Sequence, residues 1–530
     1  MNNYSILLLS TILVPLVIAI IFIGFGRLPK GVTQFLATVG FCFPALGALI
    51  LWVNFRPLDA TGYDYLMTLP TGLEGLGITL KLGLNGISVP LFFLAGIVGL
   101  ASGIYAMQSG AERIQQYLML ILFMQAGLMG VFASVDIFFF YFFHELALIP
   151  TFICIGVWGG RDRHSAAMEM TIYLTLGAML SLFGLLAIYF QSGAESFDII
   201  SLKSAVLNSP IDGGAQTIIF GLLLFGFGIL VSLFPFHSWA PRGYAAAPTS
   251  VAMLHAGVLK KFGLYGFIQV ALPLVPLGAN HWSMVLAWLG LGSVLIIGLI
   301  TIAQRDLKEM VGFSSVMHMG YCFLGIACMS VLGSAGVIIT MVAHGLTVAL
   351  LFLLGHVVYK RTETYDMDNM GGLVKHTPAL AALFSAAVFA SIGLPGPGLL
   401  NFFGEFTVFI ALWEFSRPIT AIAVLGVIIS AIYGLRAIGH IFFGSPSEVF
   451  QKHLKENSIK DISTAEKIPV LLLIITLFVI GFFPRMMTDD MNNSLEDNFS
   501  SINSELKQLA VEEAPKSPLE VTLSIEPSAK

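Results

Sequence analysis

Residues 142–150 read FFHELALIP, which places His144 and Glu145 inside an apolar stretch that runs from residue 136 to residue 160. A stretch of this length can cross a bilayer as a helix, which takes about 20 mostly apolar residues. An acidic side chain near the centre of a bilayer is costly unless it faces protein or water. The sequence therefore predicts a membrane helix whose glutamate looks into a polar interior rather than toward acyl chains.

The composition extends this interpretation to the whole chain. Of its 530 residues, 57% are hydrophobic and 11% are charged, and the mean hydropathy is +0.88. These values exclude a soluble globular domain and predict an all-α, polytopic membrane protein. A net charge of -5 with scattered basic residues argues against a nucleic-acid partner, whereas lipid contact is expected.

The cysteines lie in apolar stretches without a CxxC or CxxCH motif, at positions Cys42, Cys154, Cys322 and Cys328. Such cysteines are expected to be buried structural thiols. We therefore expect no metal, haem, disulfide or redox centre, and no cofactor bound by this chain.

Fourteen apolar segments are long enough to span a membrane. They begin near residues 4, 33, 87, 114, 136, 166, 216, 248, 283, 312, 335, 378, 418 and 468. Basic residues crowd the odd-numbered loops, and the even-numbered loops hold only Arg56, Lys81, Lys203 and Arg417. By the positive-inside rule, both termini are expected on the lumenal or periplasmic side.

Proline interrupts two of these segments, five spans apart. SLFPFHSWAP (232–241) closes the seventh span, and GLPGPGLLNFFGEF (393–406) breaks the twelfth. Broken helices at corresponding positions predict two inverted five-helix repeats that flank an ion path. The alternative is that both breaks serve only for packing.

The predicted division of the chain follows from these repeats. It consists of an N-terminal part (1–113) with three helices and a lumenal hairpin, a first repeat (114–275, helices 4–8), a second repeat (283–443, helices 9–13), a loop with helix 14 (444–488) and a polar tail (489–530). ITLKLGL (78–84) alternates apolar and polar residues, as expected for a strand of the hairpin. The tail loses the apolar pattern and is expected to be mobile or bound by a partner.

Ionisable residues recur inside the predicted spans, at Glu145, His255, Lys260, Lys261, His318, His344, His356 and Glu405. Such residues face the interior of a bundle, and together they are typical of a proton path. Lys260 and Lys261 point about 100° apart on a helix, so we expect only one to face the path squarely. His318 is expected to be held by Ser314 or Ser315, one turn earlier.

Other polar residues have simpler interpretations. His356 near a helix end is typical of a capping or interfacial group, and Asp136 of an N-terminal charge at a helix start. Arg305, Asp306, Lys308 and Glu309 are expected to form a solvated loop with local ion pairs. Glu169 either lies at the interface or reaches a basic partner, and the sequence leaves both open.

Several ordered motifs resemble one family, the antiporter-like membrane subunits of respiratory complex I and its photosynthetic relatives, specifically NAD(P)H-quinone oxidoreductase chain 4. The motifs are DIFFFYFFHELALIPTFICIGVWGG, the HSW of FPFHSW, APTS with AGVLKKFGLYG, RDLKEMVGFSSVMHMGY, MVAHGLTVALLF, and GLPGPG with NFFGEF. They cover roughly residues 80–445. The resemblance implies a proton-translocating membrane-arm subunit without a redox centre of its own. Quinone, NAD(P)H or ferredoxin, and iron–sulfur clusters would belong to other subunits of the complex.

The resemblance also implies roles for individual residues. Glu145, Lys261, His318, His344 and Glu405 would form the hydrophilic axis along which protons pass. Secondary positions near that axis are His144, Glu169, His237, Arg242, His255 and Lys260.

The departures from the family are specific. Leu230 stands where a lysine is usual, seven residues before His237, and Arg242 replaces an acid. His144 stands where a tryptophan is common, and Lys260 adds a charge beside Lys261. These departures resemble the chain 4 of cyanobacterial thylakoid complexes specialised for carbon dioxide uptake, whose partner would be a soluble carbon dioxide hydrating subunit. We hypothesise that Lys260, Arg242 or His144 supplies the missing charge near Glu145.

Two other functions remain open from the sequence. One is a cation/proton antiporter subunit of the multi-subunit sodium type, which would show sodium-dependent transport. The other is a docking scaffold for a carbon dioxide hydrating module, with a disabled channel.

Overall fold

The structure is a computed structural model that describes residues 3–56, 61–396, 398–456 and 458–512. Within these ranges, thirteen helical runs are long and apolar enough to cross a membrane. They are α1 (Asn3–Gly24), α2 (Lys30–Val53), α3 (Ser88–Met107), α4 (Ile114–Ala133), α5 (Ile137–Trp158), α6 (Arg163–Ser192), α8 (Gly213–Val231), α10–α12 (Thr249–Leu274), α13–α14 (Pro276–Ala303), α15 (Leu307–Ala327), α16 (Val331–Thr362), α19–α20 (Arg417–Phe442) and α22 (Thr464–Phe482). The predicted all-α, polytopic architecture is confirmed.

The remaining predicted span, the twelfth, is divided into two helices. α17 (Pro378–Ser391) and α18 (Leu400–Phe415) are separated by residues 392–399, and Pro397 lies outside the described residues. The seventh span is interrupted in a similar way, because α8 ends at Val231 and α9 (Trp239–Ala246) follows after a short turn. Both interruptions that the prolines predicted are therefore present.

A helix cap and two backbone hydrogen bonds fix the start of α5 in the first half of the chain. Asp136 caps α5 by accepting hydrogen bonds from the first turn, which confirms the interpretation of this residue. The N–H of Ile137 donates to the carbonyl of Phe197 (3.0 Å), and the N–H of Ile199 donates to the carbonyl of Val135 (2.7 Å). These bonds join the start of the fifth span to the segment that follows the sixth.

The same pattern recurs at the start of α15. Asp306 caps this helix, the N–H of Leu307 donates to Tyr365 O (2.9 Å), and the N–H of Met367 donates to Arg305 O (3.0 Å). Here the start of the tenth span is joined to the segment after the eleventh. A repeat offset by an odd number of spans must be inverted relative to the membrane, which supports repeats of helices 4–8 and 9–13.

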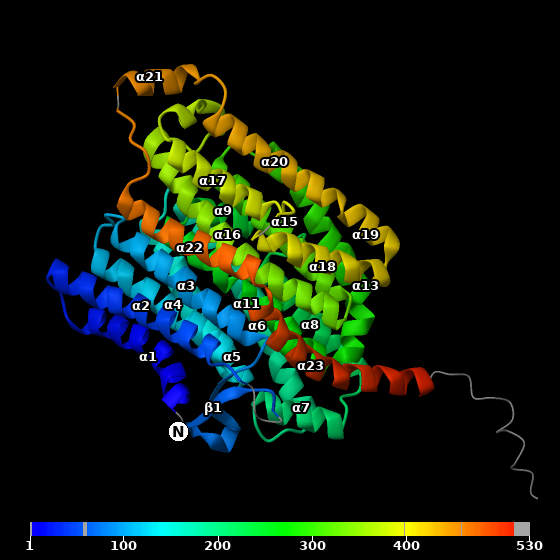
Figure 1. The fold of residues 1–530 in the computed structure, drawn as a ribbon. Coiled ribbons are helices and arrows are strands. Elements are labelled where there is room, and N and C mark those ends of the chain that lie inside the picture. Colours follow the sequence, from blue (N-terminus) through cyan, green and yellow to red (C-terminus); the bar gives the residue numbers. More distant parts are fainter. Residues whose placement is uncertain (1–2, 57–60, 397, 457, 513–530) are drawn as a thin grey trace, which may run out of the picture.

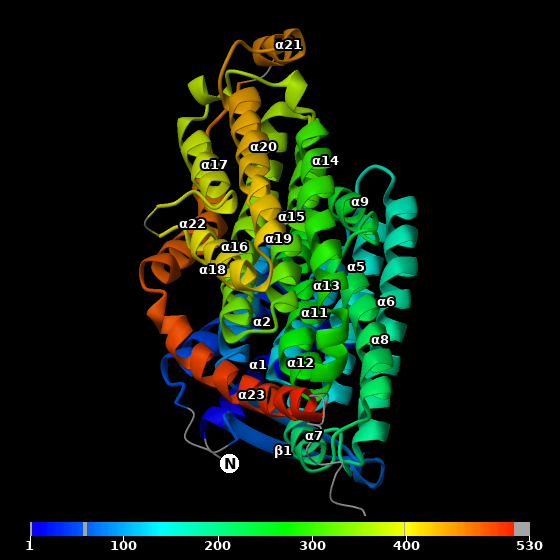
Figure 2. The ribbon, with the colours of Figure 1, turned by 90° about the vertical axis from the view of Figure 1, so that its right-hand side faces the viewer.

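The two faces of the molecule differ in what covers them. The N-terminal end, β1 (Asp64–Leu73) and α7 (Ile199–Asn208) lie at one end of the bundle, and α21 (Glu448–Glu456) lies at the other (Figures 1 and 2). We call the end with α21 and the start of α15 the basic face, because it carries most loop arginines and lysines, and the other end the hairpin face. β1 pairs antiparallel with β2 (Ile78–Leu84), so the predicted hairpin is present.

The expectation of a tail that is mobile or bound by a partner does not hold for its first part, which packs on the same chain. Residues 485–512 form one helix, α23 (Arg485–Glu512), which crosses the hairpin face in both views (Figures 1 and 2). Its buried residues recur every three or four positions, at Met487, Met491, Leu495, Phe499 and Ile502. The predicted boundary at residue 489 therefore falls inside a helix, and residues 513–530 lie outside the described residues.

α23 binds segments that are far apart in the sequence. Trp52 Nε1 donates to the carbonyl of Met486 (3.1 Å), and Lys203 Nζ donates to Asn498 Oδ1 (2.6 Å). A Cβ at Gly86 would lie 2.0 Å from the carbonyl oxygen of Asp490, so only glycine permits this approach. The helix is thus an integral part of the fold.

The most enclosed helices lie at the centre of the bundle. The apolar stretches of Thr249–Leu274 and α16 are buried throughout, whereas less than half of the apolar stretches of α1 and α6 is buried. The interior helices carry most of the ionisable residues that the sequence singled out. Their charges are consequently separated from lipid by a layer of other helices.

Candidate functional site

Two buried side chains from different halves meet at the centre of the molecule. Lys261 begins α11 (Lys261–Gly266) in the eighth span, and its Nζ lies 3.0 Å from Nδ1 of His344 on α16. The same Nζ donates to the carbonyl of Ala256 (2.5 Å). A lysine ammonium has three donors and no acceptor, so these two contacts leave one proton free for a further partner.

The contacts continue from His344 into the second repeat. The rings of His344 and His318 lie 5.8 Å apart between centroids, and His318 Nδ1 lies 2.9 Å from Glu405 Oε1. The other ring nitrogen of His318 lies 3.0 Å from the hydroxyl of Tyr433 on α20 (Leu425–Phe442). Both nitrogens of this histidine therefore have partners, which fixes the orientation of the ring.

We call Lys261, His344, His318 and Glu405 the central chain. All four residues are at most 4% exposed, and all can bind or release a proton. Two close polar contacts and one pair of neighbouring rings connect an amine on the eighth span to a carboxylate on the twelfth. This arrangement brings together four of the five residues that the sequence assigned to the axis.

The prediction for the support of His318 is wrong. Ser314 Oγ donates to the carbonyl of Val311 (2.8 Å), and Ser315 Oγ accepts a hydrogen bond from Lys260 Nζ (3.3 Å). Neither hydroxyl bonds the histidine. Tyr433, twenty-eight positions beyond Glu405, takes that role, and only tertiary packing brings it there.

Both adjacent lysines of the eighth span are buried. Residues 255–259 form a π-helical turn, in which the N–H of Lys260 donates to the carbonyl of His255 (3.0 Å). This wider turn lies immediately before Lys260 and Lys261 and interrupts the α-helical register. Lys260 reaches Ser315 on α15, whereas Lys261 reaches His344 on α16, so both lysines have interior partners and only Lys261 contacts the central chain.

Glu145 lies apart from the central chain. Its side chain is 27% exposed, and its Oε1 lies 3.5 Å from Nδ1 of the buried His144. The ring of His144 stacks on Phe262 at 3.9 Å between centroids. Among the described residues, no hydrogen bond joins Glu145 to Lys261 or to Glu405.

The residues expected near Glu145 have other partners. Arg242 NH1 lies 2.9 Å from Glu169 Oε2, and Ser238 Oγ donates to Glu169 Oε1 (2.7 Å). Of the two alternatives for Glu169, the structure shows the one in which it reaches a basic partner. His237 Nδ1 lies 3.1 Å from the carbonyl of Pro235. Leu230 is buried and offers no charge. Of the three hypothesised charges, His144 is the one that contacts Glu145.

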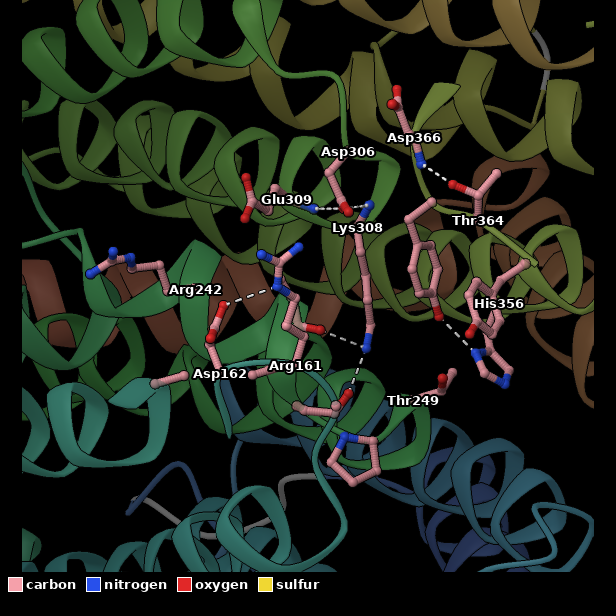
Figure 3. Close-up of a pocket in the computed structure, with 18 of the residues that line it drawn as sticks. Arg161, Asp162, Arg242, Thr249, Asp306, Lys308, Glu309, His356, Thr364 and Asp366 are labelled. Carbon is pink, nitrogen blue, oxygen red and sulfur yellow. Dashed lines mark hydrogen bonds and ion pairs between the residues drawn. The ribbon is translucent and has the colours of Figure 1, made fainter. Parts of the chain in front are cut away.

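A cavity of about 1120 Å³ opens among the ends of α5, α6, α9, α15 and α16 on the basic face (Figure 3). Its lining is strongly polar and includes Arg161, Asp162, Glu169, Arg242, Asp306, Lys308, Glu309, His356, Tyr365 and Asp366. His356 Nδ1 lies 2.7 Å from the hydroxyl of Tyr365, in keeping with the interfacial position expected for it. The cavity is the natural place for water to approach the interior from this face.

Lys308 is not part of a solvated loop, contrary to the prediction for residues 305–309. Its side chain is buried, and its Nζ donates to the carbonyls of Ala245 (3.0 Å) and Ala247 (2.6 Å), as Figure 3 shows. Arg305 remains exposed and pairs with Asp368 at 3.4 Å. Sequence spacing gave no signal for Lys308, because its acceptors are backbone carbonyls from a distant turn.

Comparisons with known proteins place this geometry in a family. The family model described as "NADH:quinone oxidoreductase/Mrp antiporter, TM" matches residues 134–432. NADH-quinone oxidoreductase subunit M of Rickettsia bellii is 30% identical over 465 residues, covering 88% of this chain and 92% of that protein. NAD(P)H-quinone oxidoreductase chain 4 2 of Thermosynechococcus vestitus is 31% identical over 451 residues, covering 84% and 82%.

Solved structures agree with the sequence relatives. A chain of respiratory complex I from Thermus thermophilus has a TM-score of 0.81 at 27% identity, covering 93% of this chain and 99% of that one. A chain of the Mrp complex from Dietzia has a TM-score of 0.80 at 19% identity, covering 95% and 99%, which shows the shared fold alone. The family match spans both halves and every residue of the central chain. The chain therefore belongs to the NADH:quinone oxidoreductase/Mrp antiporter family of transmembrane proteins.

Proposed function

We propose that this chain is a proton-translocating membrane-arm subunit of a complex I-type NAD(P)H-quinone oxidoreductase. The central chain carries the proposal, since Lys261 contacts His344, His318 contacts Glu405, and the two histidine rings lie 5.8 Å apart between centroids inside a layer of apolar helices. Family membership supports it, because relatives across most of the chain are named as subunits of such oxidoreductases. Quinone reduction and electron carriers would belong to other subunits of that complex.

The proposed function requires only proton transfer along the central chain. Each step moves one proton between neighbouring groups, and each group alternates between two protonation states. A proton that leaves Lys261 can pass to His344, then to His318, and finally to Glu405. The fixed ring of His318 aligns its Nδ1 with the carboxylate, which shortens the last step.

The test uses the complete complex in its membrane. We expect Lys261→Met and Glu405→Gln each to lower proton translocation per electron by at least about tenfold. Glu414→Gln is the matched control, since Glu414 is exposed on the same helix as Glu405. A ratio unchanged by both central variants would contradict the proposal.

A more specialised role is part of the same proposal. The departures at Leu230, Arg242, His144 and Lys260 favour a thylakoid complex for carbon dioxide uptake, with a soluble hydrating subunit as partner and both termini in the lumen. Copurification of the tagged chain with a carbon dioxide hydrating activity would support this. Copurification with a complete NADH-oxidising module, and without that activity, would contradict it.

The antiporter alternative has one observation in its favour, which is that the family description names Mrp antiporters together with the oxidoreductases. Under that alternative, proton movement through the central chain would require sodium. Measuring transport in sodium-free medium separates the two, because translocation driven by electron transfer alone excludes an obligatory exchange.

A further inference from the structure

Lys260 is a buried amine that the central chain does not use. It is 1% exposed, its Nζ donates to Ser315 Oγ (3.3 Å), and it lies 5.8 Å from the ring centroid of Tyr244. An amine buried without a functional reason is costly. Its neighbours therefore suggest where it exchanges its proton.

Two polar atoms beside Lys260 are enclosed without a hydrogen-bond partner among the described residues. They are the hydroxyl of Tyr244 and Nδ1 of His255, and the two rings lie 5.3 Å apart between centroids. Both residues are at most 2% exposed. Leaving such an atom unsatisfied is unfavourable, so the gap between these polar groups favours bound water.

The lining of the cavity on the basic face is continuous along the chain with Tyr244. Ala245, Ala247 and Thr249 line the cavity, and Tyr244 immediately precedes this lining segment. Lys308 bonds the carbonyls of Ala245 and Ala247. Lys308 and Ser315 are seven residues apart on α15, two helical turns or about 10 Å, so the cavity floor lies about that far from the partner of Lys260.

We propose that Lys260 is a proton-binding station that loads Lys261, and that protons reach it from the cavity through a water-filled branch between Tyr244 and His255. The proposal rests on the proposed function, which makes Lys261 the start of the central chain. Two ammonium groups on adjacent buried residues repel each other, so a proton arriving at Lys260 favours release from Lys261 toward His344. The transfer moves one proton between amines through water and breaks no other bond.

The functional test compares matched variants in the complete complex. We expect Lys260→Met and Tyr244→Phe each to lower proton translocation per electron, Lys260→Met by at least about tenfold. The double variant should be no slower than Lys260→Met, because both changes block one branch. Thr301→Val is the control, since this buried hydroxyl donates only within its own helix, to Ile297 O (2.7 Å).

The four variants distinguish a failure of the Lys260 branch from a failure of proton translocation through the central chain. If Lys261→Met and Glu405→Gln abolish translocation while Lys260→Met and Tyr244→Phe match the control, the branch is wrong and the function stands. If all four variants match the control, the proposed function fails. Should Lys260→Met prevent assembly, a water-resolving map of the unaltered complex decides, because a dry gap between Tyr244 Oη and His255 Nδ1 overturns the branch.

Discussion

Glu405 and Glu145 lie in opposite halves of an inverted repeat, and their surroundings differ. Glu405 is 4% exposed and contacts His318, which is held in turn by Tyr433. Glu145 is 27% exposed at its side chain, and its neighbours are His144, at 3.5 Å, and Tyr141, both on its own helix. The polar groups of the second half thus find their partners in the interior, whereas the carboxylate of Glu145 is partly exposed.

Leu230 explains part of this difference. A lysine at that position would give the first half an internal cation, and the leucine leaves His144 as the nearest basic group to Glu145. The two halves share the same cap, at Asp136 and at Asp306, while their buried polar contacts differ. The halves are consequently expected to respond unequally to equivalent substitutions.

The largest effect is expected from Glu405→Gln. The amide keeps the shape but cannot carry the proton that His318 delivers, so proton translocation per electron should fall by at least about tenfold. Electron transfer and proton uptake measured together in membrane vesicles would show this. If Glu405→Gln lowered proton translocation less than Glu145→Gln does, the second half would not be the more important one for transport.

Glu145→Gln is expected to have a smaller effect, a loss of several-fold. Its carboxylate is partly exposed and is not bonded to the central chain, so a parallel path through Lys260 and Lys261 can continue. The same vesicle assay applies, with His144→Phe as a companion variant that keeps a ring stacked on Phe262. Equal losses for Glu145→Gln and Glu405→Gln would mean that the two halves are functionally equivalent.

Tyr433→Phe should produce a moderate decrease, about two- to fivefold. The ring remains in place, but Nε2 of His318 loses its hydrogen bond, which is worth about 1 kcal/mol. Because the hydroxyl orients the histidine rather than carrying the proton, the pH profile of translocation should shift while assembly stays normal. An unaltered pH profile would show that Tyr433 serves packing alone.

Asp136→Asn is expected to change stability rather than transport. Burial raises the pKa of Asp136, at the edge of the membrane, to about 6, so the folded state holds this proton while the unfolded state, with a pKa of about 3.9, releases it. Stability therefore falls as pH rises from about 4 to about 6, and the loss is complete above that range. Asparagine keeps the cap without the charge and should recover on the order of 2 kcal/mol at neutral pH.

Thermal unfolding of the purified complex in detergent at pH 4.5 and pH 7 would check this. The gain should be present at pH 7 and smaller at pH 4.5. Asp306→Asn in the equivalent cap of the second half is the comparison variant, and an identical pH-dependent gain there would show that the two caps have the same environment.

Much of the site could be predicted from sequence because buried charge is conspicuous in apolar helices. Glu405, His318, His344 and Lys261 stood out on that ground, and their contacts join them. The helix breaks could also be predicted from the sequence, because proline removes a backbone donor wherever it occurs. These features depend on the residue itself rather than on distant neighbours.

The remainder depends on tertiary partners that no local pattern encodes. Lys308 is buried because two carbonyls some sixty residues earlier accept its protons. The π-helical turn before Lys260 has no recognisable sequence signal. α23 has a polar composition overall, and only its sparse apolar stripe, read with helical spacing, indicates that it binds the bundle.

The position of α23 has a consequence for biogenesis. The helix is synthesised after all the spans, yet it contacts residues as early as Trp52 and Gly86 and also Lys203. Those sites stay open during translation until the ribosome has passed residue 512, so the hairpin face is the last part to mature. A chain cut after α22 would leave uncovered the surface on which Met487, Met491 and Leu495 pack.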